Sequence, residues 1–310
     1  MNNDQIISWL LNGDVSIQYQ ANKDLLKEDR KDLQKRISEE GWGKEFLSKR
    51  NSDGQWGQKF YQPKWTSSHY TLLDLRNLCI VPTHQLIKES LDKIVNECKV
   101  QDGGIGPAPP DGKSDVCVNG MFLNYASYFN TDEGDLASVV DFLLSQHMKD
   151  GGFNCRSNRS LAVHSSFHST VSVLEGITEY EKNGYQYRVI ELAWARKQAI
   201  EFILKHRLFL SDHTGDIIHK DFLKLSYPSR WRYDILRALD YFQYAKVPWD
   251  NRMKKALEVL ARKRNKDGTW NVQAKHPGQV HFDMEKAGKP SKWNTLRALR
   301  VLKHYNLLDQ

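Results

Sequence analysis

Cysteine is scarce in this chain, and no two cysteines lie close together in the sequence. The 310 residues include four, Cys79, Cys98, Cys117 and Cys155. Zinc fingers require closely spaced cysteines and histidines, so that class is excluded. The N-terminal segment 1–14 also lacks the basic start and the small-residue cleavage site of a secretory signal. We therefore expect free thiols in a reducing, cytoplasmic environment.

Long hydrophobic runs and concentrated charge are missing as well. No apolar stretch approaches the roughly 20 residues of a membrane-spanning helix, so we expect no integral membrane segment. The net charge is +7, but the 45 Lys and Arg residues are interleaved with 38 Asp and Glu residues. Nucleic-acid binding needs a concentrated basic stripe, and none is present. An anionic small-molecule substrate is compatible with this surface, whereas nothing in the sequence indicates the oligomeric state.

Three widespread catalytic signatures are absent. The chain contains no phosphate loop of the form GxxxxGK[ST], no dinucleotide-binding GxGxxG and no GxSxG. Each of these motifs places main-chain groups or a nucleophile at the start of a helix. Any enzymatic activity of this chain must therefore come from another arrangement of side chains.

The most informative feature that is present is a turn of the form Asp-Gly-(Gly/Gln/Thr)-(aromatic/Ile). It begins at Asp53, Asp102, Asp150 and Asp267, and a degenerate copy of the motif surrounds Gly215. The glycines of these five turns are 49, 48, 64 and 53 residues apart. A period of about 50 residues indicates a repeat architecture. Because each repeat packs on its neighbours, we expect one domain that spans residues 1–310.

Two kinds of helical segment alternate around these turns. Charged amphipathic segments, expected on the outside, precede the turns at 32–49, 85–99, 136–147, 192–206 and 252–264. Segments with more aromatic and small residues, expected on the inside, follow them at 67–78, 116–129, 167–181, 230–244 and 292–305. With a first pair at 5–11 and 17–27, this pattern predicts an all-α fold of six helix pairs without strands, an (α/α)6 toroid. Three long linkers, at 106–115, 155–163 and 272–290, are expected over the mouth of its central cavity.

In its repeated turn and its six helix pairs, the chain resembles the superfamily of prenyltransferases and squalene cyclases. The resemblance implies an atypical, stand-alone member of bacterial type. The resemblance covers nearly the whole chain and implies an α/α toroid with a central site. The chain lacks the Asp-x-Asp-Asp with which squalene–hopene-type cyclases protonate an alkene, and the Asp-Asp-x-x-Asp that binds magnesium diphosphate. It is also short of the extra material through which a protein prenyltransferase pairs with its α subunit. Proton-initiated cyclisation and protein prenylation are therefore both disfavoured.

Alignment of the inner segments by their apolar pattern predicts one layer of side chains at one end of the cavity. The residues at equivalent positions are His69, Cys117, His168, Trp231 and Trp293. In the resembling family an Asp-x-Cys pair and a histidine one helix later bind zinc. The resemblance therefore implies Asp115, Cys117 and His168 as zinc ligands.

The same residues have other interpretations. His69, His164 and His168 are candidates for acid–base catalysis, because histidine titrates near neutral pH. Asp234 is a further catalytic candidate, since with Asp115 it supplies the two carboxylates that a glycoside hydrolase needs. Alternatively, the thiol is an ordinary buried side chain and the histidines form hydrogen bonds at helix starts.

Basic and aromatic side chains are expected around the cavity mouth. The stretch 151–160, GGFNCRSNRS, resembles the part of the family's sequence that holds an isoprenoid diphosphate, which implies Arg156 and Arg159 as anion ligands. Arginine binds phosphate and carboxylate with two parallel hydrogen bonds. Further cations are expected nearby, at Lys113, Arg230, Arg232, Lys275 and His276. An aromatic wall that contacts an isoprenoid or stacks on a sugar is expected at Trp65, Tyr227, Trp231 and Trp293.

These patterns favour an enzyme whose cavity binds an anionic substrate, with an isoprenoid diphosphate as one possibility and the His/Cys/Asp cluster as its metal or acid–base site. Two alternatives stay open. One is a carbohydrate-active α/α barrel that acts on acidic sugars. The other is a non-catalytic repeat scaffold, because function belongs to sites rather than to folds.

Overall fold

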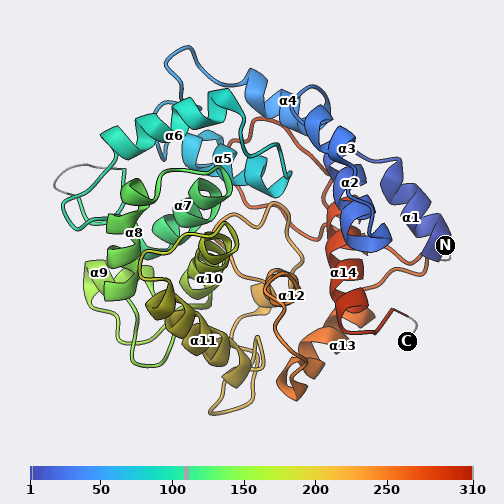
Figure 1. Ribbon diagram of the computed structural model, residues 1–310. Helices are drawn as coiled ribbons and strands as arrows, with labels where there is room; N and C mark the ends of the chain where they lie inside the picture. Colours follow the sequence, from blue (N-terminus) through green and yellow to red (C-terminus); the bar gives the residue numbers. More distant parts are fainter. Residues whose placement is uncertain (2, 108–111, 309–310) are drawn as a thin grey trace.

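The computed structural model describes residues 1, 3–107 and 112–308, and its fold is all-α, as predicted. The helices nearer the middle of the molecule in Figure 1 are called the central helices below. They are α2 (Val15–Gln20) with its π-helical continuation Ala21–Leu26, α5 (Ser68–Asn77), α7 (Val116–Tyr128), α10 (Phe167–Lys182), α12 (Ile235–Tyr244) and α14 (Lys292–His304).

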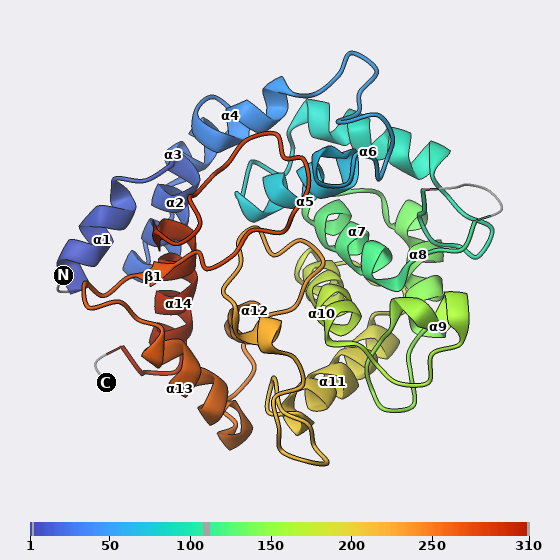
Figure 2. The same ribbon diagram turned by 180° about the vertical axis from the view of Figure 1, so that it is seen from behind.

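A second set of helices lies around the periphery in both views (Figures 1 and 2). They are α1 (Asn3–Leu11), α3 (Lys31–Arg36), α4 (Gly41–Ser48), α6 (Gln85–Glu97), α8 (Glu133–Ser145), α9 (Cys155–Ser160), α11 (Val189–Lys205) and α13 (Lys254–Arg262). The predicted outer segment 32–49 is thus two helices, and the predicted linker 155–163 contains α9. Short 3-10 turns occur at Lys64–Thr66, Lys220–Leu223 and Asn251–Met253.

One short pair of strands was not predicted. β1 (Trp270–Asn271) and β2 (Pro290–Ser291) pair antiparallel and so bring together the two ends of the long linker between them. In Figure 2 this linker runs across one face of the molecule, near α5 and α12. It is held there by Trp65, whose indole Nε1 donates to the carbonyl of Pro277 at 2.7 Å.

The repeated turns have one geometry, and it explains why the phrase recurs. Gly54, Gly103, Gly151 and Gly268 have φ between 89° and 96°, a region that residues with a Cβ rarely adopt. The main-chain N–H two residues after each of these glycines donates to a side chain on the next central helix. These bonds are Trp56 to Ser68 (2.9 Å), Ile105 to Asn119 (2.7 Å), Phe153 to Thr170 (3.0 Å) and Trp270 to Thr295 (3.0 Å).

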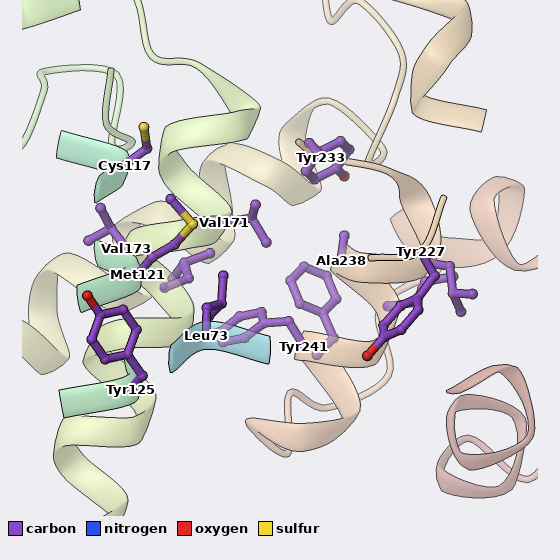
Figure 3. Close-up of a cluster of buried hydrophobic side chains, with 14 of the residues drawn as sticks. Leu73, Cys117, Met121, Tyr125, Val171, Val173, Tyr227, Tyr233, Ala238 and Tyr241 are labelled. Atoms are coloured by element: carbon purple, nitrogen blue, oxygen red, sulfur yellow. The ribbon is translucent and has the colours of Figure 1, made fainter. Parts of the chain in front are cut away.

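Two of the turns also hold the preceding peripheral helix through a fully buried tryptophan. The indole of Trp56 donates to the carbonyl of Phe46 in α4 (2.7 Å), and that of Trp270 donates to Leu260 in α13 (2.8 Å). The turn therefore joins a peripheral helix to the central helix that follows it. The hydrophobic core is contiguous from Ile6 to Leu302, and Figure 3 shows part of it between α5, α7, α10 and α12.

The central helices α7 and α10 pack with their backbones in contact. A Cβ added at Gly120 would lie 2.7 Å from main-chain atoms of Ser172 and Val173, and one at Gly176 would lie 2.4 Å from the carbonyl oxygen of Gly120. Main-chain atoms in a packed helix cannot move aside cheaply. Glycine at these two positions therefore sets the distance between the helices. No helix among the described residues is both long and apolar enough to cross a membrane.

We expect Gly120→Ala to lower the free energy of unfolding by about 1–3 kcal/mol, the usual effect of overpacking. The matched control is Gly134→Ala in α8, where an added Cβ has no neighbour within 4 Å. Because alanine favours helix over glycine by up to about 1 kcal/mol, this control should be neutral or stabilising. Urea denaturation followed by circular dichroism measures both, and equal effects of the two substitutions would contradict the packing argument.

Candidate functional site

A cavity of about 720 Å³ lies among the central helices, towards their C-terminal ends. Its wall includes Asn77 at the end of α5, Tyr128 at the end of α7, Lys182 at the end of α10, Tyr244 at the end of α12 and Arg300 near the end of α14. We call it the central cavity. All the central helices thus contribute to it, mainly from the end opposite to the predicted layer of side chains, although Trp293 of that layer also lines it.

The deep part of the central cavity is lined by arginines that pair with carboxylates. Arg230 contacts Asp74 at 2.5 Å, and both side chains are almost fully buried. Arg237 holds Glu175 through two hydrogen bonds of 2.8 and 2.7 Å. Such two-pronged pairs are the strong form of this contact. Each pair joins segments that are distant in the sequence.

Asp240 is the most connected carboxylate of this wall. It accepts hydrogen bonds from Arg297 (3.0 Å) and from Arg300 (2.5 and 2.6 Å), and Arg300 also contacts Asp24 at 3.1 Å. Burial alone would raise the pKa of the Asp240 carboxyl, but Arg300 and Arg297 outweigh that effect and hold this pKa below its usual value. Asp240 is therefore ionised at neutral pH.

A fifth arginine completes the network. Arg76 contacts Glu179, which also accepts a hydrogen bond from the Tyr244 hydroxyl at 2.8 Å. The pKa of Glu179 is lowered, because Arg76 and these hydrogen bonds outweigh the effect of burial. With Glu179 included, the five arginines of the wall face five carboxylates, so the formal charges of this inner layer balance.

Lysines supply the excess charge of the cavity. Those that line it are exposed and lie nearer its mouth: Lys23, Lys27, Lys31, Lys182 and Lys246. Lys31 pairs with Asp29 at 3.4 Å, whereas Lys27 and Lys246 make no ion pair with any described residue. Helix C-termini each contribute about half a negative charge, roughly −3 for six helices, and so offset only part of this excess.

Aromatic side chains form another part of the wall. The rings of Tyr227 and Trp293 stack with their centroids 4.9 Å apart and their planes 29° apart. The Tyr227 hydroxyl and the Trp293 indole N–H are buried, and neither has a hydrogen-bond partner among the described residues. Buried polar groups are nearly always hydrogen-bonded. Both groups therefore keep unused hydrogen-bonding capacity within the wall of the cavity.

The structure places four of the five residues of the predicted layer at equivalent positions, and the fifth, Trp231, contacts His168 with the ring centroids 5.1 Å apart. His69, Cys117, His168 and Trp293 are each the second residue of a central helix, as the alignment requires, but Trp231 lies in the loop before α12. Asp234 ends this loop as the N-cap of α12, where its carboxylate accepts the main-chain N–H of Arg237 at 2.9 Å. Of the predicted site residues, Arg230, Tyr227 and Trp293 line the central cavity.

His69 is enclosed in the core. Its Nδ1 lies 3.1 Å from the Tyr125 hydroxyl, and the rings of Phe60 and Tyr61 pack against it. Complete burial lowers the pKa of His69 to about 3, so the ring is neutral at pH 7. This environment suits a packed, hydrogen-bonded histidine.

Two of the residues implied as zinc ligands, Cys117 and His168, take part in other hydrogen bonds in this structure. The main-chain N–H of Cys117 donates to Cys155 Sγ at 3.0 Å, and His168 Nδ1 accepts the N–H of Tyr233 at 2.8 Å. Asp115 is the N-cap residue of α7. Within the described part of the chain, no three His, Cys, Asp or Glu side chains are grouped so as to hold a metal ion. The function proposed below does not depend on zinc.

The remaining predicted residues lie apart from the central cavity. Arg156 is exposed on α9, which lies at the periphery in Figure 1. Arg159 belongs to the same helix, but its side chain is outside the described part of the structure. Lys113 donates to the carbonyl of Asn158 at 3.1 Å, and His164 is exposed beyond α9. Trp65 and Trp231 pack at the N-terminal side of the central helices.

Sequence reasoning missed most of the charged wall. Arg76, Arg237, Arg297 and Arg300 were not singled out, although each interrupts an otherwise apolar central segment. A charge on the inward side of such a helix requires a buried partner. The conflict between a charged side chain and its apolar surroundings was the signal by which these arginines could have been found in the sequence.

No protein-family model matches the chain, and no curated protein matches it in sequence. The argument for function therefore depends on the geometry of the site.

We expect Asp240→Asn to lower the free energy of unfolding by about 3–5 kcal/mol, because it leaves Arg297 and Arg300 buried with too little negative charge. The control is Asp32→Asn, which removes the exposed partner of Arg30 and should leave stability nearly unchanged. Guanidinium denaturation measures both. A small effect of Asp240→Asn would show that the charge balance of this wall is not needed for folding.

Proposed function

We propose that the protein binds a small, hydrophilic anion in the central cavity, and that an acidic sugar or a sugar phosphate is the class that fits best. The observation that carries the proposal is the two-layer wall. Ten Lys and Arg side chains and four Asp and Glu side chains line the cavity, a net charge of +6. The lysines favour an anionic group near the mouth, and the charge-balanced inner layer favours a polar body below it.

The inner layer argues against an isoprenoid chain. Pockets for apolar ligands are lined mainly by apolar side chains, whereas this cavity has ion pairs at its centre. An isoprenoid would remove the remaining water from Arg230, Arg237 and Arg297 without offering them a hydrogen bond, which is unfavourable. Sugar hydroxyls can both donate to the carboxylates and accept from the guanidinium groups.

The state of the carboxylates favours binding over catalysis. Each of the four that line the cavity contacts an arginine: Asp24 with Arg300, Asp74 with Arg230, Glu175 with Arg237, and Asp240 with Arg297. A glycoside hydrolase needs one carboxyl that holds a proton and one that acts as a base or nucleophile. Carboxylates held by guanidinium groups are instead suited to accept hydrogen bonds from the hydroxyl groups of a bound sugar.

We also propose that the alternating central and peripheral helices form a complete (α/α)6 toroid. The repeated turn supports this arrangement, because it joins one peripheral helix to the next central helix in four places along the chain. A likeness to prenyltransferases and squalene cyclases would then be one of architecture, with a cavity adapted to hydrophilic ligands.

The first test compares ligands by thermal unfolding and calorimetry. Glucose 6-phosphate and glucuronate should raise the melting temperature of the full chain, and glucose should not. At a ligand concentration of 100 times Kd the expected stabilisation is about 2.7 kcal/mol. The double variant Lys27→Ala/Lys246→Ala should weaken binding, whereas Lys44→Ala on the peripheral helix α4 should not. Binding of farnesyl diphosphate in preference to every hydrophilic anion would overturn the proposal.

The second test uses Lys182. Although much of the side chain is exposed, its ammonium lies 3.2 Å from the centre of the Tyr244 ring and donates to the Tyr244 carbonyl. Its pKa is lowered to about 8, mainly by partial removal from water; Arg76, Lys246 and Lys23 also lower this pKa, whereas Glu179 raises it. A bound anion raises that pKa, so binding takes up protons and affinity falls as the pH rises through about 8.

Calorimetry in buffers of different ionisation enthalpy measures this proton uptake. We expect uptake near pH 8 in the wild-type protein and its loss in Lys182→Met. The variant Lys44→Met serves as the control, since its side chain lies on the outer surface. Proton uptake that is unchanged in Lys182→Met would place the anion away from this lysine.

A further inference from the structure

A second, smaller cavity of about 300 Å³ lies on the opposite side of the loop that precedes α12. Its wall includes His168 from α10, Arg232 and Asp234 from the loop, and Lys275 and His276 from the linker between β1 and β2. Arg230 lines the central cavity, but Arg232, two residues later, lines this one. The loop therefore separates the two cavities and presents one arginine to each.

The two arginines differ in their partners. Arg230 is paired with the buried carboxylate of Asp74 at 2.5 Å. The guanidinium of Arg232 forms no ion pair with any described residue, and its buried Nε has no hydrogen-bond partner among them. Its one described side-chain contact is with the ring of Trp231, 4.8 Å from the guanidinium carbon to the ring centroid. A buried guanidinium donor without an acceptor is unfavourable unless a ligand or solvent satisfies it.

Basic side chains with hydrogen-bond donors lie near Arg232 in the wall of this cavity. His276 Nε2 is also buried and has no partner among the described residues. Lys224 and Lys275 stand at the wall, although each contacts a carboxylate, Asp221 at 2.6 Å and Asp283 at 2.6 Å. The Asp234 carboxylate, which also lines the cavity, is engaged as the N-cap of α12. Among the described residues of this wall, Arg232 is the arginine or lysine that forms no ion pair, and Asp221, which also lines the cavity, pairs with Lys224.

Burial and the surrounding cations lower the pKa of both histidines of the wall. The pKa of His168 is lowered to about 4, mainly by burial and also by Arg237 and Arg232. The pKa of His276 is lowered to about 4 by burial, Arg232 and Arg230. Arg232 is thus one of the cations that lower the pKa of both rings. At pH 7 the histidines are therefore neutral hydrogen-bonding groups, and the site does not require their protonation.

We propose that this smaller cavity is a separate binding site for a tetrahedral oxyanion, phosphate or a phosphate monoester, held by the guanidinium of Arg232 with His276 as a second donor. The planar guanidinium matches the spacing of two phosphate oxygens. The cavity holds one such group but is less than half the volume of the central cavity. This site is independent of the ligand proposed for the central cavity.

Calorimetric titration of the full chain with inorganic phosphate at pH 7 tests the proposal. We expect one binding event whose Kd rises at least about tenfold in Arg232→Met, the usual effect of losing a charge-assisted hydrogen bond. Arg232→Lys should recover only part of the affinity, since lysine keeps the charge but loses the two-pronged geometry. Because Arg232 makes no ion pair, its variants should melt at the wild-type temperature without phosphate. His276→Gln provides a second variant in which phosphate binding should be weaker.

Two controls separate this site from the rest of the molecule. Arg156→Met removes an exposed arginine at the periphery and should leave phosphate binding unchanged. The variant Lys27→Ala/Lys246→Ala, which weakens the central cavity, should also leave it unchanged. The proposal is overturned if phosphate does not bind at millimolar concentration, or if Arg232→Met binds it as tightly as the wild type. Loss of binding only in the Lys27/Lys246 variant would place the phosphate in the central cavity.

Discussion

Paired charges at the middle of the molecule are the constraint on which its shape depends. An apolar interior would close up as its helices packed together. Here Arg230, Arg237 and Arg297 each bind a carboxylate from another segment, and these polar groups line a cavity of about 720 Å³. Removing one partner from such a pair is strongly unfavourable. The network therefore makes the cavity a specified part of the fold, and it determines what kind of molecule the cavity can accept.

The repeated turn provides the frame around this network. It uses glycine at positive φ to reverse the chain and a main-chain N–H to hold the following central helix. Trp56 and Trp270 add a bond back to the preceding peripheral helix. Because these contacts are local, the frame does not depend on the residues that face the cavity. Charged side chains can thus be placed at the centre without loss of the arrangement around them.

The loop before α12 links the two cavities. Arg237 donates to the carbonyls of both Arg230 and Arg232 at 3.0 and 2.8 Å, and its guanidinium also holds Glu175. One side chain of the inner wall thus supports the loop whose arginines face opposite cavities. The charge balance at the centre and the geometry of the smaller site depend on the same residue.

The helices and their alternation could be predicted from the sequence, because turn glycines and apolar periodicity are local signals. The prediction that His69, Cys117, His168 and Trp293 occupy equivalent positions also follows from periodicity, and all four are second residues of central helices. Trp231 does not follow this pattern, since Asp234 caps α12 three residues later and leaves Trp231 in a loop. The wall of the central cavity was missed because the pairing of Arg300 with Asp240 and Asp24 joins residues far apart in the sequence.

The sequence by itself thus determined the helical class, the positions of the repeated turns and the excess of basic residues, all of which depend on neighbouring residues or on composition. Only the tertiary structure decided which of those basic residues have counter-ions. Arg230 and Arg232 are two residues apart and chemically identical, yet one is paired with Asp74 and the other has no acidic partner among the described residues. That difference arises from the direction in which the loop presents each side chain, which no local signal encodes.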